Sequence, residues 1–152
     1  MSNLYDNTSV AVLERQIDEW LAGFAVVNPA IVAIDRGEGD ILRWYVRMRG
    51  EEKEFITVWL TLGQRTLRYE AYVMPAPEEN AEALYENLLR RNEKLVGLHF
   101  AIGIEDAVFV RGDLPLAALC ESELDRVVGS LYATTEQCFQ GLLRIGFASR
   151  FL

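Results

Sequence analysis

The segment LRWYVRMRGEEKEFITVWLTLGQRTLRYEAYVM, residues 42–74, decides the fold because hydrophobic and polar residues alternate along most of it. A period of two places successive side chains on opposite faces of a β-strand. The pattern predicts strands at residues 42–49, 55–62 and 67–73, separated by short turns. Consecutive strands joined by short turns indicate an antiparallel meander.

We expect this meander to bury one face and to leave the other open, as half-buried antiparallel sheets do. The buried face is expected to hold large apolar and aromatic residues: Leu42, Trp44, Val46, Met48, Ile56, Val58, Leu60, Leu62, Leu67, Tyr69, Ala71 and Val73. The other face mixes arginine, threonine, glutamate and aromatic residues: Arg43, Tyr45, Arg47, Arg49, Phe55, Thr57, Trp59, Thr61, Arg68, Glu70 and Tyr72.

Further elements flank the meander on both sides. Apolar residues recur every three or four positions over residues 10–24, which predicts a helix. A short β-branched stretch at residues 31–35 predicts a strand, and Pro75-Ala76-Pro77 precedes a second helical pattern. Two more strands are expected at residues 98–104 and 107–111, before a long helix near the C-terminus.

The resulting order, α-β-β-β-β-α-β-β-α, predicts an α+β fold in which helices flank an antiparallel β-sheet. A chain of 152 residues suits one domain. We expect a flexible N-terminus over residues 1–8 and a single domain over residues 9–152.

The helix ends carry local signals. Thr8 or Ser9 is expected to cap the first helix, and Ser122, with Asp125 three residues on, the last one. Gly129 is expected to let another element pack closely on the last helix. The second helix is expected to place acidic residues in its first turns and basic residues in its last, where the helix dipole favours them: Glu78, Glu79 and Glu82, then Arg90, Arg91 and Lys94.

The charge balance excludes several classes of partner. Fifteen Lys and Arg against 23 Asp and Glu give a net charge of −8, which disfavours non-specific binding to nucleic acid or to anionic lipid. We see no basic leader and no apolar run of about 18 residues, so we expect a cytoplasmic protein that neither enters nor crosses a membrane. Two cysteines are too few for a disulfide framework and agree with a reducing compartment.

Residues that could support catalysis or bind a metal are scarce. His99 is the only histidine, so neither a histidine metal pair nor a relay can form. Cys138 falls on the apolar stripe of the last helix and is expected to be buried and inert, whereas Cys120 precedes that helix beside two glutamates that oppose thiolate formation. We therefore expect no enzyme, no cofactor and no metal.

One strand stands out as a recognition element. Arg43, Tyr45, Arg47 and Arg49 alternate along it and should share its open face. Basic and aromatic side chains on an open strand could stack nucleic-acid bases, but the net charge argues against that use. A polar sheet face with Glu54 and Glu70 as cross-strand partners, or a protein contact, fits better.

The C-terminal third resembles the YbjN-type domain, a family described as bacterial sensory transduction regulators and grouped with type III secretion chaperone-like proteins. The resemblance lies in Gly-Asp-Leu-Pro-Leu-Ala-Ala-Leu at residues 112–119 and in Leu124-Asp125-Arg126-x-x-Gly129. It extends to the strand pair Phe100-x-Ile102 and Val108-x-Val110 and to residues 142–147, and the element order agrees over residues 9–147.

The resemblance implies a non-enzymatic, chaperone-like or regulatory module of the bacterial cytoplasm. Secretion chaperones of this fold are dimers that hold extended polypeptide, so we expect a protein or peptide client and a homodimer. The alternative is a small-molecule-sensing domain that binds its ligand between the sheet and the C-terminal helix. The residues expected to bind a partner are Arg43, Trp44, Tyr45, Arg47, Arg49, Trp59 and Tyr72, and Tyr69 is also expected to be available.

Overall fold

The strands form one six-stranded antiparallel sheet with the order β1-β2-β3-β4-β6-β5 in a computed structural model, which describes residues 4–152. Their bounds are β1 Ile31–Arg36, β2 Leu42–Arg49, β3 Phe55–Leu62, β4 Thr66–Met74, β5 His99–Ile102 and β6 Val108–Pro115. The helices are α1 Asn7–Val27, α2 Ala81–Asn92 and α3 Glu121–Gly146, with single turns at Ile104–Asp106, Leu116–Ala118 and Ala148–Phe151. The predicted fold class and element order are confirmed.

The meander has the predicted register. β2 and β3 begin and end where the alternation predicts, and they pair over their whole length, from Leu42 opposite Leu62 to Arg49 opposite Phe55. β4 pairs with β3 on one side and with β6 on the other. β5 is shorter and β6 longer than predicted, because the chain leaves β5 at Gly103 through a turn in which Glu105 and Asp106 have left-handed backbone angles.

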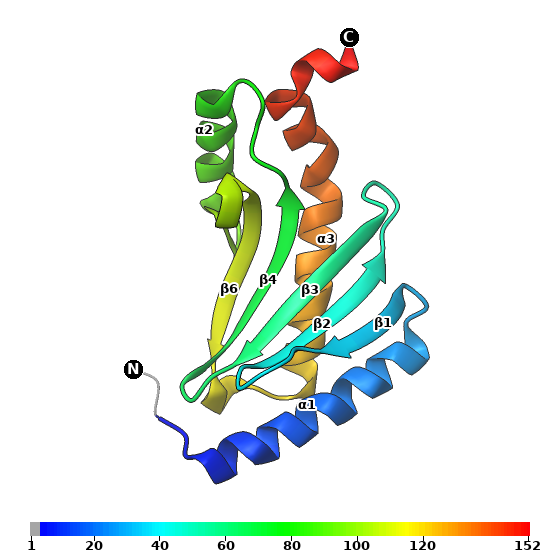
Figure 1. The fold of residues 1–152 in the computed structure, drawn as a ribbon, viewed down its shortest axis with the longest axis vertical. Helices are drawn as coiled ribbons and strands as arrows, with labels where there is room; N and C mark the ends of the chain where they lie inside the picture. The colour runs from blue at the N-terminus through cyan, green and yellow to red at the C-terminus, as the bar shows by residue number, and fades with distance from the viewer. Residues whose placement is uncertain (1–3) are drawn as a thin grey trace.

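The helices cover one side of the sheet. In Figure 1 the sheet lies in front of α3, and α1 runs along the β1 end of the sheet. α3 packs mainly on β4 and β3, whereas α2 contacts β5 and α3. The core lies between the sheet and these helices.

The predicted stripe of α3 faces this core. Its buried residues include Leu124, Val127, Val128, Leu131, Thr135, Cys138 and Leu142, which recur at the spacing of one helical face, and the predicted burial of Cys138 is confirmed. Leu131 and the facing Val58 and Leu60 have no exposed surface. Burying side chains of this size stabilises the fold by about 1.5–3 kcal/mol each.

The predicted helix caps are wrong. Asp6 caps α1, since its carboxylate accepts the Ser9 backbone N–H at 2.8 Å, and Thr8 and Ser9 lie within the helix. α3 begins at Glu121, so Ser122 stands inside the first turn, and no side chain caps this helix. Gly129 is exposed with no other element close to it, so it does not admit a close-packed neighbour within the described chain.

The start of α2 also differs from the prediction. Glu78 and Glu79 precede the helix, and only Glu82 lies in its first turn. The two earlier glutamates instead bind the C-terminal turn: Glu78 pairs with Arg150, and Glu79 accepts from the backbone and hydroxyl of Ser149. Lys94 lies beyond the helix, whereas Arg90 and Arg91 lie in its last turn as predicted.

The N-terminal segment is described only in part. Residues 1–3 of the expected flexible segment 1–8 lie outside the described residues. Residues 7 and 8 belong to the first turn of α1, and the Tyr5 backbone N–H donates to the Gln64 carbonyl at 2.6 Å. Within residues 4–152, no helix has the length and apolar character needed to cross a bilayer.

Candidate interaction surface

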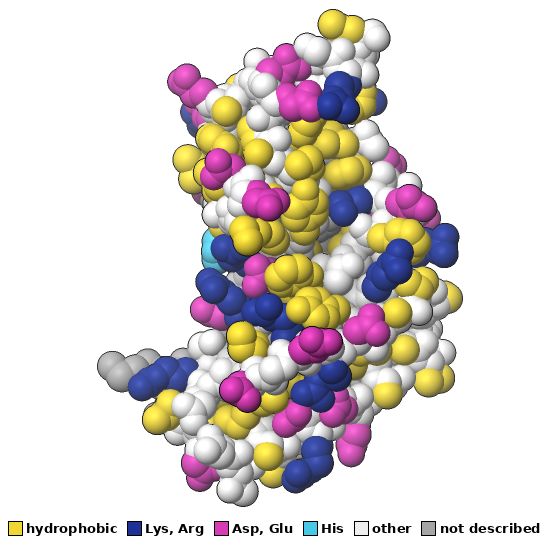
Figure 2. Space-filling model, viewed as in Figure 1, with side chains coloured by type: hydrophobic (Ala, Val, Ile, Leu, Met, Phe, Trp, Pro, Cys, Tyr) yellow, Lys and Arg dark blue, Asp and Glu magenta, His cyan; other side chains and the backbone are white. Residues whose placement is uncertain are grey.

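The open face is the side of the sheet that points away from α3, and alternate residues of the strands form it. It faces the viewer in Figure 1, and Figure 2 shows hydrophobic side chains gathered over the sheet from this side, with basic and acidic ones among them. Its members are Ala33, Asp35, Arg43, Tyr45, Arg47, Arg49, Phe55, Thr57, Trp59, Thr61, Arg68, Glu70, Tyr72, His99, Ala101, Phe109, Arg111 and Asp113.

The arginines of β2 lie on this face as the alternation predicts. Arg47 and Arg49 are exposed, and Arg43 and Tyr45 are half-buried. Arg47 stacks over the Phe55 ring with its guanidinium carbon 3.9 Å from the ring centroid, and Arg49 approaches the same ring at 5.4 Å. These contacts hold two flexible side chains over one ring and leave their N–H groups able to bind an anion.

Arg43 is fixed in a similar way. Its guanidinium carbon lies 5.4 Å from the Trp59 ring, and its Nε donates to the Thr61 hydroxyl at 2.9 Å. Over residues 4–152 no ion pair joins Arg43, Arg47 or Arg49 to a carboxylate. The β2 arginines therefore present their charge outward.

Aromatic rings continue across the sheet beside these arginines. Tyr45 meets Trp59 edge-on at 5.4 Å, Trp59 meets Phe109 at 6.5 Å, and Phe109 meets Tyr72 at 5.6 Å. Such edge-to-face pairs hold the rings in fixed orientations. Phe109 is only 3% exposed, and a Cβ at Gly103 would overlap its ring, so the turn after β5 closes tightly over it. The rings thus form a rigid apolar strip.

Glu54 and Glu70, the acidic residues expected to neutralise the β2 arginines, form no ion pair with them within the described chain. Glu70 pairs at 3.1 Å with Arg111 of β6, its neighbour in the register, and not with β2. The expected cross-strand pairing with β2 is therefore wrong, because β3 separates β2 from Glu70.

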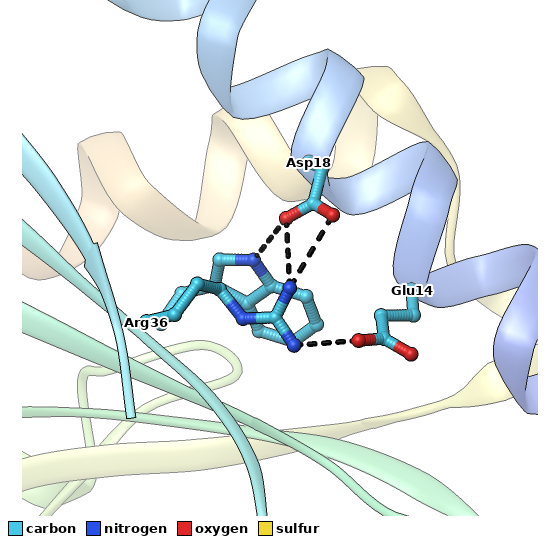
Figure 3. A network of polar contacts seen from close by, with 4 residues as sticks. Glu14, Asp18 and Arg36 are labelled. Atoms are coloured by element: carbon cyan, nitrogen blue, oxygen red, sulfur yellow. Dashed lines mark hydrogen bonds and ion pairs between the residues drawn. The ribbon is translucent and has the colours of Figure 1, made fainter. Parts of the chain in front are cut away.

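Trp44 and Tyr69 are not available to a partner, contrary to the expectation. Trp44 has no exposed surface, and its indole Nε1 donates to Asp18 Oδ1 at 2.7 Å. Arg36 stacks on the Trp44 ring at 4.5 Å and pairs with Glu14 and Asp18 (Figure 3). The alternation places both aromatics on the buried face, where Trp44 fastens α1 to the sheet and Tyr69 donates to the Gly97 carbonyl at 2.7 Å.

The turn between β2 and β3 is clamped to α3. One carboxylate, that of Glu136, accepts the backbone N–H groups of Glu51, Glu52 and Lys53 at 2.8, 2.9 and 3.2 Å. Tyr132 and Gln140, one turn before and after Glu136, donate to the carbonyls of Arg49 and Glu52. This clamp fixes the end of the hairpin that carries Arg49 and Phe55.

Lys53 joins the clamp to the open face. Its ammonium group donates to the Phe55 carbonyl at 2.9 Å and lies 5.5 Å from the Tyr72 ring and 5.7 Å from that of Phe139. Burial lowers the pKa of Lys53, and the nearby Glu136 carboxylate partly offsets that effect. The side chain therefore packs as a half-buried amphipathic group.

Of the other chemical candidates of the sequence, His99 lies at the edge of the open face, opposite Arg111, whereas the two cysteines lie at the start of α3 and within it. His99 is exposed on the edge strand β5. Burial raises the pKa of Cys138 to about 11, whereas the hydrogen bond with the Ser122 hydroxyl lowers the pKa of the exposed Cys120. In the described part of the chain, no three acidic, histidine or cysteine side chains come together as metal ligands.

A second apolar feature lies at the edge of the sheet that β5 forms. A groove of about 270 Å³ runs between α2 and β5, and it is lined by Tyr85, Leu88, Leu89, Asn92, Phe100, Ala101 and Ile102. Leu89 at its lip is 70% exposed. The Asn92 amide accepts from the Phe100 N–H at 2.6 Å and donates to its carbonyl at 3.3 Å, as a neighbouring strand would. This edge is therefore closed to strand pairing at Phe100.

The space between the central strands and α3 is filled, and the cavity between the sheet and this helix, about 130 Å³ beside Phe100 of β5, is small. Between the central strands and α3, the side chains of Val58, Leu60 and Leu131 are fully buried and belong to one hydrophobic core. A close-packed core of this kind holds few voids larger than a water molecule. The structure offers the small-molecule alternative no support at that position.

Sequence reasoning missed several residues of this region. Phe109 and Arg111 lie on the open face, and so does Phe55, which the alternation predicted there but which was not among the residues expected to bind a partner. The pairing of Arg111 with Glu70 required the strand order, since β4 and β6 are not consecutive. Glu136 gave no local signal because its partners in the β2–β3 turn are distant in sequence.

Comparison with known proteins places the chain among related bacterial sequences. Residues 14–144 match the family model YbjN, described as "Putative bacterial sensory transduction regulator". An uncharacterized protein of Mycobacterium tuberculosis and one of Mycobacterium bovis are each 36% identical over 104 residues, which is 68% of this chain and 57% of theirs. One of Mycobacterium leprae is 32% identical over 109 residues, 72% of this chain and 59% of its own. The chain thus spans less than two thirds of these relatives.

Proposed function

The chain belongs to the YbjN family, and on that basis we propose that it is a non-enzymatic regulatory module of the bacterial cytoplasm that binds a protein or peptide on its open face. The observation that carries this proposal is the strip of ordered aromatic rings beside arginines that have no carboxylate partner in residues 4–152. Aromatic residues and arginine are the types enriched at binding hot spots.

The open face suits a docking surface because it is ordered before a partner arrives. Phe55 and Trp59 hold the arginines, and Glu136 clamps the adjoining turn. A surface that is already ordered loses little conformational entropy on binding. The chemistry of the described residues favours binding over catalysis, because the single His99 is exposed on an edge strand.

Cross-linking in the bacterial host tests the site. A photoreactive phenylalanine analogue replaces Thr57 at the centre of the open face or, as the control, Ala133 on the exposed side of α3. We expect a discrete protein adduct at position 57, its loss when Tyr45→Ala and Arg47→Glu are added, and no matching adduct at position 133. Equal adducts at both positions, or none at position 57, would refute the proposal.

A second copy of the chain is the proposed occupant of the groove between α2 and β5. The charges of α2 favour antiparallel pairing with itself: Glu82 lies in its first turn and Arg91 in its last, while Glu86 and Arg90 pair with each other at 3.1 Å. In such a twofold contact, each half would meet charges of opposite sign. The exposed Leu89 of one copy would enter the groove of the other.

Sedimentation tests this dimer. We expect the parent to sediment as a dimer, Leu89→Asp as a monomer, and the control Val26→Asp, at an exposed position on α1, as a dimer. A parent that stays monomeric at 100 µM (on the order of a weak complex's dissociation constant), or a dimeric Leu89→Asp variant, would show that the groove does not hold a second copy.

A further inference from the structure

We infer that the partner segment bound by the open face is acidic, with carboxylates at every second residue of an extended stretch; this inference rests on the function proposed above. It concerns Arg43, Arg47 and Arg49, which project from alternate positions of β2. Strand residues two apart lie roughly 6.6 Å from each other along the strand. An extended segment laid on this face repeats at the same spacing, so its alternate side chains can meet these arginines in turn.

The local charge of the open face is opposite to that of the whole chain. The molecule carries a net charge of −8, yet the face holds Arg43, Arg47, Arg49, Arg68 and Arg111 against Asp35, Glu70 and Asp113. Of these, Arg111 and Glu70 neutralise each other at 3.1 Å. At physiological salt the screening length is about 8 Å, so the arginines beside a docked carboxylate outweigh the distant negative charges.

The geometry of the arginines favours a carboxylate. A guanidinium presents a planar fork of N–H donors that matches both oxygens of a carboxylate. Arg47 and Arg49 lie over the Phe55 ring at 3.9 and 5.4 Å, which restricts both forks and excludes water from one side of each. The entropy of ordering these side chains is thus largely lost before binding.

The neighbouring strip of rings accounts for the remaining side chains of the partner. Tyr45 and Trp59 lie beside the arginines, and Tyr72 is 36% exposed at the far end of the strip. An apolar side chain of the segment that points toward the face at Tyr45, in place of one carboxylate, can rest on these rings. A second copy of the chain is a poor occupant, because a twofold contact would bring identical arginines together.

Peptide binding measured by fluorescence anisotropy tests the inference on the full chain. The probes are three labelled 12-residue peptides that alternate valine with glutamate, glutamine or lysine, and a 12-nucleotide single-stranded DNA. We expect the glutamate peptide to bind at least tenfold more tightly than either other peptide at 150 mM salt, and more tightly than the DNA. Binding should weaken as salt rises, since exposed charges are screened.

Two charge-reversed variants locate the effect. Arg47→Glu with Arg49→Glu should lower the affinity for the glutamate peptide at least tenfold and raise that for the lysine peptide. Arg15→Glu with Arg144→Glu, on the exposed sides of α1 and α3, makes the same change in net charge and should leave the affinity within twofold. The thermal midpoints of both variants should match the parent, because all four side chains are exposed.

The outcomes separate this inference from the proposed function. Equal affinity for the glutamate and glutamine peptides, lost in Tyr45→Ala, would overturn the acidic preference and keep the open face as the docking surface. Tighter binding of the DNA would replace a protein partner with a nucleic acid. An affinity for the glutamate peptide that both charge-reversed variants lower equally would show that net charge, and not this face, is responsible.

Discussion

Replacing Gly50 by alanine should open the clamp between the β2–β3 turn and α3. A Cβ at Gly50 would overlap both the Lys53 carbonyl oxygen and Oε1 of Glu136, far inside van der Waals contact. One of these atoms belongs to the backbone and the other to a carboxylate that holds three N–H groups. Neither can move without breaking the clamp, so the turn must shift as a whole.

The expected loss follows from the bonds that break. Hydrogen bonds to a charged group contribute roughly 1.5–3 kcal/mol each when buried, but Glu51 and Glu52 are exposed, so water replaces part of their bonding. Taking about 0.7 kcal/mol for each of the three bonds gives a loss of about 2 kcal/mol in the free energy of unfolding. The shift should also displace Arg49 and Phe55, which adjoin the turn.

Urea unfolding measures this loss. Gly63→Ala is the matched control, because a Cβ at Gly63 in the next turn meets only the Thr66 carbonyl oxygen at 3.5 Å, an ordinary contact. We expect Gly50→Ala to lower the free energy of unfolding by about 2 kcal/mol and the control by less than about 1 kcal/mol. Glu136→Ala should lower it by a similar amount, with less than additive loss in the double variant. A Gly50→Ala protein as stable as the parent would refute the clamp.

Other variants test the core, the attachment of α1 and the cysteines. Leu131→Asp should abolish cooperative thermal unfolding, since an unpaired charge at a fully buried position costs several kcal/mol; a melting curve like that of the parent would disprove the α3 stripe. Asp18→Ala should cost about 1–2 kcal/mol by chemical denaturation because Trp44 Nε1 loses its acceptor, whereas Asp18→Asn, which keeps an acceptor oxygen, should cost less than 1 kcal/mol; equal losses would assign the effect to the exposed Arg36 pair instead. Iodoacetamide at pH 8 should label Cys120 in the native protein and Cys138 only after unfolding, because the pKa of Cys138 is raised to about 11 by burial; native labelling of Cys138 would contradict that burial.

The alternation of residues 42–62 predicted the first and last residues of β2 and β3 correctly. It did so because one face of these strands is buried and the other is open. The cap of α1 escaped prediction since Asp6, Thr8 and Ser9 are all competent caps, and only the path of the chain selects Asp6.

The candidate site divides in the same way. The shared face of Arg43 to Arg49 follows from local alternation, whereas the stacking on Phe55 depends on strand pairing. Trp44 was expected to bind a partner because of its residue type, although its place in the alternation already predicted it in the core. The Glu136 clamp joins segments distant in sequence, and no local pattern encodes it.

The most direct test of the open face as the docking surface uses the partner identified by cross-linking, once it is purified. Sedimentation measures its affinity for the parent chain and for a Tyr45→Ala/Arg47→Glu variant. We expect the variant to bind the partner at least about 30-fold more weakly, or ~2 kcal/mol, with its thermal midpoint little changed. A variant that keeps both the parental midpoint and the parental affinity would show that these arginines and rings are ordinary solvated sheet and that the partner binds elsewhere.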